Sequence, residues 1–232
     1  MKHVQTFEIF INEAYRYKGG EYPDYAKEDL NNQIQEEIAK QGFTADLNHL
    51  DISQVTDMSY LFYNANNPAL SKFNGDISKW NVSRVTNMRG MFMHSNFNGD
   101  ISKWNVSQVN NMREMFSYSE FNGDISKWNV SQVKDMTSMF LESEFNGDIS
   151  KWNVSQVKKP NGMRWMFQNS KFQGDVSQWA TSLRMKSALY ELMAPFENLD
   201  PELINNLISI AIKKKIPLSG KTLNKPPFSD LT

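Results

Sequence analysis

Cysteine is absent from the sequence, and only three of its 232 residues are histidines. The lack of thiols excludes disulfide frameworks, thiolate zinc sites and cysteine nucleophiles. A large excess of either charge is also missing, because 25 lysines and arginines stand against 26 aspartates and glutamates, for a formal net charge of −1. This balance argues against a nucleic-acid partner, which needs a basic surface.

Long apolar runs are missing too, since no segment approaches the roughly 18 apolar residues of a membrane span. We therefore predict no membrane span. Near the N-terminus, Glu8 and other polar residues stand where a secretory signal peptide needs an apolar stretch. On this ground the sequence predicts a cytoplasmic protein, or a cell-surface or secreted one if a signal has been lost or export follows a non-classical route.

What the sequence has in abundance is an internal repeat. One segment, Phe-Asn-Gly-Asp-Ile-Ser-Lys-Trp-Asn-Val-Ser-Gln-Val, occurs identically at 97–109, 121–133 and 145–157. It recurs with a single change, Arg84, at 73–85, and looser copies begin at Phe43 and Phe172. The unit is 24 residues long, as the spacing of Trp80, Trp104, Trp128 and Trp152 shows. Repeats of this length are typical of stacked-unit architectures.

Each unit combines two hydrophobic periodicities, as 97–120 illustrates. The apolar residues of 101–106 end in alternation, which predicts a short strand. Those of 109–116 follow the spacing i, i+3, i+6, i+7, which predicts about two turns of helix. Between them, Ser107 is a predicted helix N-cap, and Gly99 is expected to take a positive φ in a turn.

A single unit cannot bury its own apolar face, whereas stacked units can. We therefore predict an α/β solenoid of about six units, each with one short parallel strand and one short helix. Equivalent residues would then stack in columns about 4.8 Å apart. One buried column, closed by Leu50, would contain Trp80, Trp104, Trp128, Trp152 and Trp179. Methionine pairs would fill the helix side of the core.

The string Trp-Asn-Val-Ser-x-Val-x-x-Met-x-x-Met-Phe, followed by Phe-Asn-Gly-Asp-Ile, resembles the BspA-like leucine-rich-repeat family of bacterial surface proteins. The resemblance covers roughly 43–183. It implies a right-handed, leucine-rich-repeat-like coil and a binding role, often adhesion. It implies no catalytic residues.

The ends of such an array need caps that cover exposed apolar surface. We predict four regions: an N-terminal helical cap over 1–42, the repeat solenoid over 43–183, a C-terminal helical cap over 184–216 and a flexible tail over 217–232. In the first cap a helix is expected from about Asp24 to Gln41, because its apolar residues recur at four-residue intervals before Gly42.

No constellation of catalytic residues stands out. His49 and His94 occupy different positions in the repeat, and phosphate-binding loops, histidine zinc pairs and nucleophile elbows are missing. We therefore predict a protein that is not an enzyme, with no cofactor and no metal. The aspartate of each unit could attract Ca²⁺, but a lysine three residues later favours neutralised turn chemistry instead.

Partner-binding candidates fall into two groups. Lysines and asparagines that recur in the four most similar units would pave either a polar binding strip or an asparagine ladder: Lys79, Lys103, Lys127, Lys151, Asn81, Asn105, Asn129 and Asn153. Residues that differ between units on the outer helix side are more informative about a specific partner: Arg89, Arg113, Tyr118, Arg164 and Trp165. Trp165 is a hot-spot candidate, or alternatively packs under the C-terminal cap.

These observations favour a non-catalytic protein–protein interaction or scaffold module that presents a repeat surface. The expected partner is a protein of unidentified kind, and the chain is expected to be a monomer. Two alternatives remain: a bacterial surface adhesin or host-contact protein, and a carbohydrate-binding protein.

Overall fold

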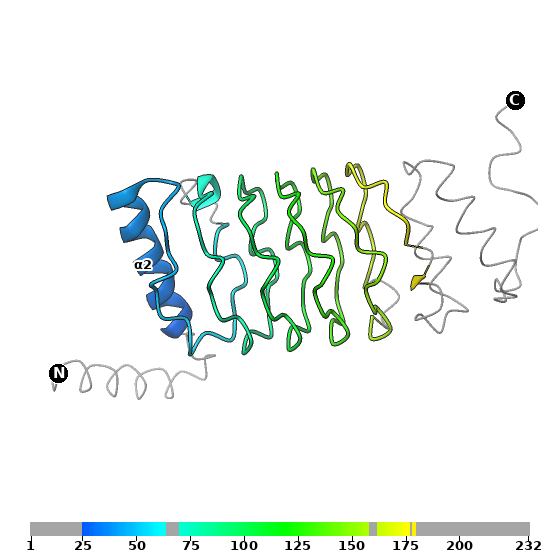
Figure 1. Cartoon of the computed structure of the whole chain (residues 1–232), viewed down its shortest axis with the longest axis horizontal. Helices are drawn as coiled ribbons and strands as arrows, with labels where there is room; N and C mark the ends of the chain where they lie inside the picture. Colours follow the sequence, from blue (N-terminus) through cyan, green and yellow to red (C-terminus); the bar gives the residue numbers. More distant parts are fainter. Residues whose placement is uncertain (1–24, 64–69, 158–161, 177, 180–232) are drawn as a thin grey trace, which may run out of the picture.

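The computed structural model describes residues 25–63, 70–157, 162–176 and 178–179. In these residues the repeats form a row of stacked coils, and the helix α2 (Tyr25–Gln41) lies against the N-terminal end of the row (Figure 1). Among residues 42–176 that the structure describes, the one further helical segment is the short 3-10 helix η1 (Leu70–Lys72). The predicted C-terminal cap, the tail and the first part of the N-terminal cap lie outside the described residues.

Helix α2 confirms the helix expected before Gly42. It buries the side chains of Leu30, Ile34 and Ile38 against the first coil. Gly42 ends it with a φ of 84°, and its N–H donates to the carbonyl of Ile38 at 2.8 Å. This is the left-handed conformation in which helices commonly end at glycine. The apolar side of α2 thereby covers the N-terminal end of the core.

The predicted α/β architecture is wrong. The described residues contain no strand, and parallel pairing is limited to isolated bridges: Asp46 with Asp76, Asp57 with Asn87, Asn87 with Asn111, and Asn111 with Asp135. Within residues 43–63, 70–157 and 162–176, no repeat unit contains an α-helix. The structure therefore does not have the parallel sheet and helical layer of a leucine-rich repeat.

The segment expected as a strand is a pair of tight turns. The Trp104 N–H donates to the Ile101 carbonyl at 3.1 Å, and the Val109 N–H donates to the Val106 carbonyl at 3.0 Å. Each bond closes a four-residue turn. Apolar residues thus return to the core because the backbone bends, and not because an extended strand alternates between two faces.

The segment expected as a helix is a run of successive turns. Met115 N–H donates to Met112 O, Ser117 N–H to Glu114 O, and Ser119 N–H to Phe116 O, at 3.1–3.3 Å. The amides between these bond outside their own unit. The N–H groups of Glu114, Phe116 and Tyr118 donate to carbonyls of the next unit at 2.7–2.9 Å. A helix would direct all of these amides along its own chain. Apart from the pairing of Asp46 with Asp76, the parallel bridges therefore lie on the half of the unit where a helix was predicted.

The tryptophan column is confirmed as core. Its five indoles are 1–4 % exposed, and the rings of Trp80 and Trp104 stack 6.4 Å apart at 5°. Each indole N–H also donates to a carbonyl of the preceding unit, as from Trp128 to Ile101 at 3.1 Å. Leu50, expected to close the column, is partly buried against the same core. The indoles therefore tie neighbouring units together by packing and by hydrogen bonds.

Phenylalanines form a second continuous element of the core. Two files of rings interleave: Phe62, Phe92, Phe116, Phe140 and Phe167 in one, and Phe73, Phe97, Phe121, Phe145 and Phe172 in the other. The ring of Phe116 lies 4.3 Å from that of Phe121 and 5.7 Å from that of Phe140. The buried methionines pack beside these files, as expected.

Two local predictions need correction. Ser107 does not cap a helix, because none follows; its N–H instead donates to Asn105 Oδ1 at 3.2 Å. Gly99 has no positive φ; a Cβ there would lie 2.8 Å from the ring of Phe97 and 3.1 Å from the carbonyl of Gly75. Glycine is needed at that position for close approach and not for an unusual turn.

Candidate functional site

The recurring asparagines of the first candidate group are exposed but serve local turns. The Oδ1 atoms of Asn81, Asn105, Asn129 and Asn153 each accept the N–H of the serine two residues later, at 3.1–3.2 Å. They are therefore not an inter-unit ladder. That ladder is formed by another set of asparagines: Asn98 N–H donates to Asn74 Oδ1 at 2.8 Å, and Asn122 N–H to Asn98 Oδ1 at 2.9 Å.

The recurring aspartates make the same kind of turn. Asp100 Oδ1 accepts the Ser102 N–H at 2.9 Å. Hydrogen bonds from the Ser102 hydroxyl and N–H lower the pKa of Asp100, and the ammonium of Lys103 lowers it further. Asp124 has a lowered pKa for the same reasons. Among the described residues, no three His, Asp or Glu side chains gather into a metal-binding group.

Replacing these aspartates by asparagine removes the negative charge but keeps the oxygen that accepts the serine N–H, so it separates the two contributions to stability. In the wild type, a folded-state pKa below the unfolded value of about 4 stabilises the fold above that pH, and this contribution is lost as the pH falls through the folded pKa. Asn retains the accepting oxygen. We therefore expect Asp76→Asn/Asp100→Asn/Asp124→Asn/Asp148→Asn to lose less stability than wild type on acidification. Urea denaturation at a series of pH values measures this, and parallel curves for the two proteins would contradict it.

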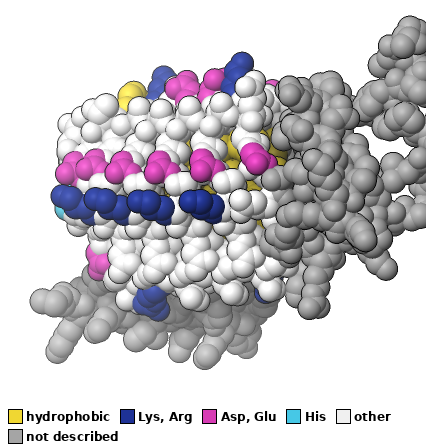
Figure 2. All heavy atoms as spheres, turned by 45° about the vertical axis from the view of Figure 1, so that its right-hand side comes forward, with side chains coloured by type: hydrophobic (Ala, Val, Ile, Leu, Met, Phe, Trp, Pro, Cys, Tyr) yellow, Lys and Arg dark blue, Asp and Glu magenta, His cyan; other side chains and the backbone are white. Residues whose placement is uncertain are grey.

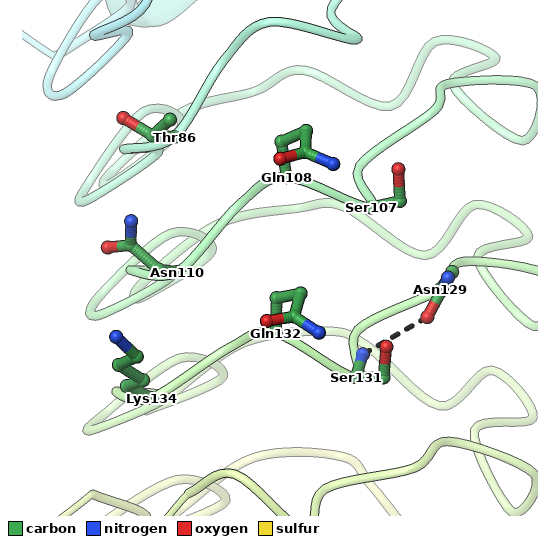
Figure 3. A pocket seen from close by; sticks show the side chains of 8 residues that line it. All are labelled: Thr86, Ser107, Gln108, Asn110, Asn129, Ser131, Gln132 and Lys134. Atoms are coloured by element: carbon green, nitrogen blue, oxygen red, sulfur yellow. Dashed lines mark hydrogen bonds between the residues drawn. The ribbon is translucent and has the colours of Figure 1, made fainter.

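A shallow polar groove of about 470 Å³ crosses three units beside these turns. Figure 3 shows Gln108 and Gln132 at equivalent places of successive coils, with Thr86, Asn110 and Lys134 along one edge. The amides of both glutamines make no hydrogen bond within the described part of the chain. None of the described residues that line the groove is aromatic, and the carbohydrate-binding alternative stays a prediction.

The second candidate group lies on the outer side of the turn run, which we name the aromatic–arginine face. It comprises Tyr60, Tyr63, Arg89, His94, Arg113, Glu114, Tyr118, Glu142, Arg164 and Trp165. Two of its members are among the most exposed large apolar side chains: Tyr118 at 42 % and Trp165 at 38 %. The structure thus places Trp165 partly in solvent.

Contacts within this face link neighbouring units. The guanidinium carbon of Arg89 lies 5.3 Å from the centre of the Tyr60 ring, and Arg89 Nη2 lies 3.3 Å from Glu114 Oε2. Arg113 Nε is 3.1 Å from the other oxygen of Glu114. At the later end, the guanidinium carbon of Arg164 lies 4.0 Å from the centre of the Trp165 ring.

An aromatic stack continues the face across units. The rings of His94 and Tyr118 lie 4.5 Å apart at 10°, and Tyr63 lies 5.8 Å from His94. The Tyr118 hydroxyl donates to Glu142 Oε1 at 3.3 Å. These contacts fix the orientation of the exposed rings.

The backbone under this face is strained. Two positions of the unit take φ between 51° and 59° with a side chain present: Tyr60, His94, Glu114, Tyr118, Ser138, Glu142, Trp165 and Asn169. The same conformation is adopted by Gly90, where it costs little. Bulky residues rarely occupy it, because Cβ crowds the backbone. The chain therefore presents Tyr, Trp and His where glycine would be the least costly residue.

Sequence reasoning found Arg89, Arg113, Tyr118, Arg164 and Trp165, which the structure places along one face. It missed the residues that connect them, namely Tyr60, Tyr63, His94, Glu114 and Glu142. The available signal was position in the unit: most of these residues share the outward positions of Trp165 and Tyr118. The left-handed backbone had no such signal, since tyrosine and tryptophan do not suggest it.

A comparison with known families finds two overlapping matches, at residues 29–142 and 117–199, to the family described as "Mycoplasma protein of unknown function, DUF285". The chain belongs to this family. The matched DUF285 region begins inside α2 and covers the described repeat units. The chain is therefore a repeat-containing domain of a family without an assigned function.

Other comparisons add no relatives to the DUF285 match. No curated protein and no solved structure matches the chain. Within the described residues, every helix is too short or too polar to cross a bilayer.

Proposed function

We propose that the chain is a non-catalytic protein-interaction module whose partner contacts the aromatic–arginine face. The observation that supports this most directly is the strained backbone beneath exposed rings. Holding Tyr118 or Trp165 at a positive φ costs about 1 kcal/mol relative to glycine. Folding gains little from these partly exposed rings, so a binding role is the more economical explanation.

The composition of the face supports the same proposal. Tyrosine, tryptophan and arginine are the residues that contribute most to protein–protein binding energy. Here, Arg164 lies over Trp165, while Arg89 and Arg113 share Glu114. Such pre-organised groups combine apolar contact area with directional hydrogen bonds. The adhesin alternative rests on the resemblance to BspA-like surface proteins and stays a hypothesis.

Two substitutions at Tyr118 separate stability from binding. Tyr118→Ala and Tyr118→Gly remove the same ring, but only the glycine releases the strain at a φ of 56°. We expect Tyr118→Gly to be more stable than Tyr118→Ala by about 1 kcal/mol, as measured by urea denaturation. An alanine variant as stable as the glycine variant would contradict the strain.

Partner capture tests the function itself. The full chain is immobilised and exposed to extracts of the source organism and of surfaces that it contacts, and bound proteins are quantified by mass spectrometry. Tyr118→Gly/Trp165→Gly should reduce recovery of the partner at least about tenfold. Lys103→Ala, on a different face, should leave it unchanged. Equal recovery of every protein by the wild type and the double variant would reject the proposal.

A further inference from the structure

Two straight rows of opposite charge run side by side along the stack, on the side of the unit that contains the Asn-Gly-Asp turns (Figure 2). The acidic row contains Asp76, Asp100, Asp124 and Asp148, and the basic row contains Lys79, Lys103, Lys127 and Lys151. All eight side chains are exposed. Successive charges within a row are spaced by one unit, about 5 Å.

These charges form no ion pairs in the part of the chain that the structure describes. Each aspartate accepts a serine N–H with one oxygen, as Asp124 does from Ser126 at 2.9 Å, but no lysine of the basic row comes within ion-pair distance of a carboxylate. Like charges about 5 Å apart repel by roughly 1 kcal/mol in water. The rows relieve this repulsion only in part by lying next to each other.

We propose that this face binds the same face of a second copy of the chain, with the acidic row of each copy on the basic row of the other. A second copy has the same unit spacing, so every charge of one row meets its opposite in register. A two-fold axis parallel to the stack exchanges the two rows and gives this pairing. A two-fold axis across the stack would place aspartate on aspartate.

Other partners fit these rows less well. An extended polyanion would be attracted by the basic row but repelled by the acidic row beside it, and a polycation would meet the reverse. A lipid surface has no fixed spacing to match the units. The sequence led us to expect that the two columns neutralise each other within a monomer, and the proposed dimer departs from that expectation.

Charge-altered variants test the pairing. Lys103→Glu/Lys127→Glu leaves two acidic rows at the centre of the face. Asp100→Asn/Asp124→Asn removes the two central charges of the acidic row, leaves the basic row intact and keeps the oxygen that closes each turn. We expect each variant alone to be monomeric and their mixture to associate at least about tenfold more tightly than either alone. Sedimentation equilibrium in about 50 mM salt measures these constants.

Controls make each outcome decisive. Wild type should associate in about 50 mM salt and weaken at least about tenfold in about 500 mM salt. Glu120→Gln/Glu144→Gln changes net charge as much as Asp100→Asn/Asp124→Asn but lies outside the rows, and should associate like wild type. The proposal is overturned if wild type stays monomeric in low salt, if the mixture gains nothing, or if this control variant loses association. Partner capture through the aromatic–arginine face does not depend on any of these results.

Discussion

Phe116→Ala should destabilise the protein by about 3–5 kcal/mol. Phe116 is fully buried at the centre of the phenylalanine files, with Phe92, Phe121 and Phe140 rings 4.3–5.7 Å away. Removing the ring leaves a cavity, and rigid neighbouring rings on three sides cannot collapse into it. Because each unit contacts mainly its neighbours, the loss interrupts the core between the earlier and later units. Urea denaturation followed by tryptophan fluorescence measures the loss.

The matched control for this substitution is Phe43→Ala. Phe43 is 40 % exposed, and its ring lies 5.8 Å from the Lys72 ammonium. We expect a loss below about 1 kcal/mol there, since little apolar area leaves the core. Similar losses at Phe43 and Phe116 would show that the stacked rings do not hold the units together.

Gly75→Ala is expected to destabilise the fold by about 3 kcal/mol, whereas Gly123→Ala should cost about 1 kcal/mol. At Gly75 an added Cβ would lie 2.0 Å from the carbonyl oxygen of Ala45. At Gly123 the nearest backbone atom is 3.6 Å away, and only the Phe121 ring is closer, at 2.9 Å. A ring can rotate or shift slightly, but the backbone of the adjoining unit cannot move without breaking its hydrogen bonds.

The pair of glycines is its own control, because both follow the same Phe-Asn and precede the same aspartate. Thermal and urea denaturation of the two variants give the difference in free energy of unfolding. Equal destabilisation would mean that the ring contact, which both share, determines the cost. A larger loss at Gly75 would identify the close approach to the first unit as the tightest packing in the array.

The sequence predicts much of the burial pattern but not the backbone. The period and the apolar positions identify the tryptophan column and the buried methionines, since these depend only on which residues must leave water. The spacing i, i+3 is shared by helices and by successive tight turns, so the residues from Val109 to Phe116 do not distinguish them. Whether the backbone forms a helix or successive turns depends on where alternate N–H groups find their acceptors. In this structure those acceptors are carbonyls of the next unit.

The same limit applies to the candidate surface. Trp165 and Tyr118 were identified because they differ from their counterparts in other units, a signal that needs no geometry. The bond from Tyr118 to Glu142 and the stacking on His94 join residues 24 positions apart. Their contact depends on how the coils lie on each other. The positive φ at Trp165 depends on the turn type, which the aromatic residue itself disfavours.

The direction of the inter-unit hydrogen bonds in the turn run has an electrostatic consequence. The N–H groups of Met88, Gly90, Phe92 and His94 donate forward to carbonyls of the next unit. The bonds that flank them run backward, as from Asn110 to Thr86 and from Glu120 to Ser95. Forward backbone bonds outnumber backward ones between neighbouring units, so the peptide dipoles along the stack cancel only in part. The negative end of the resulting macrodipole lies beside α2, where the Lys27 ammonium bonds Asp57 and Ser59 at 3.3 and 2.7 Å. Each added unit lengthens this dipole, so the array is electrically polar from end to end although its formal charges nearly cancel.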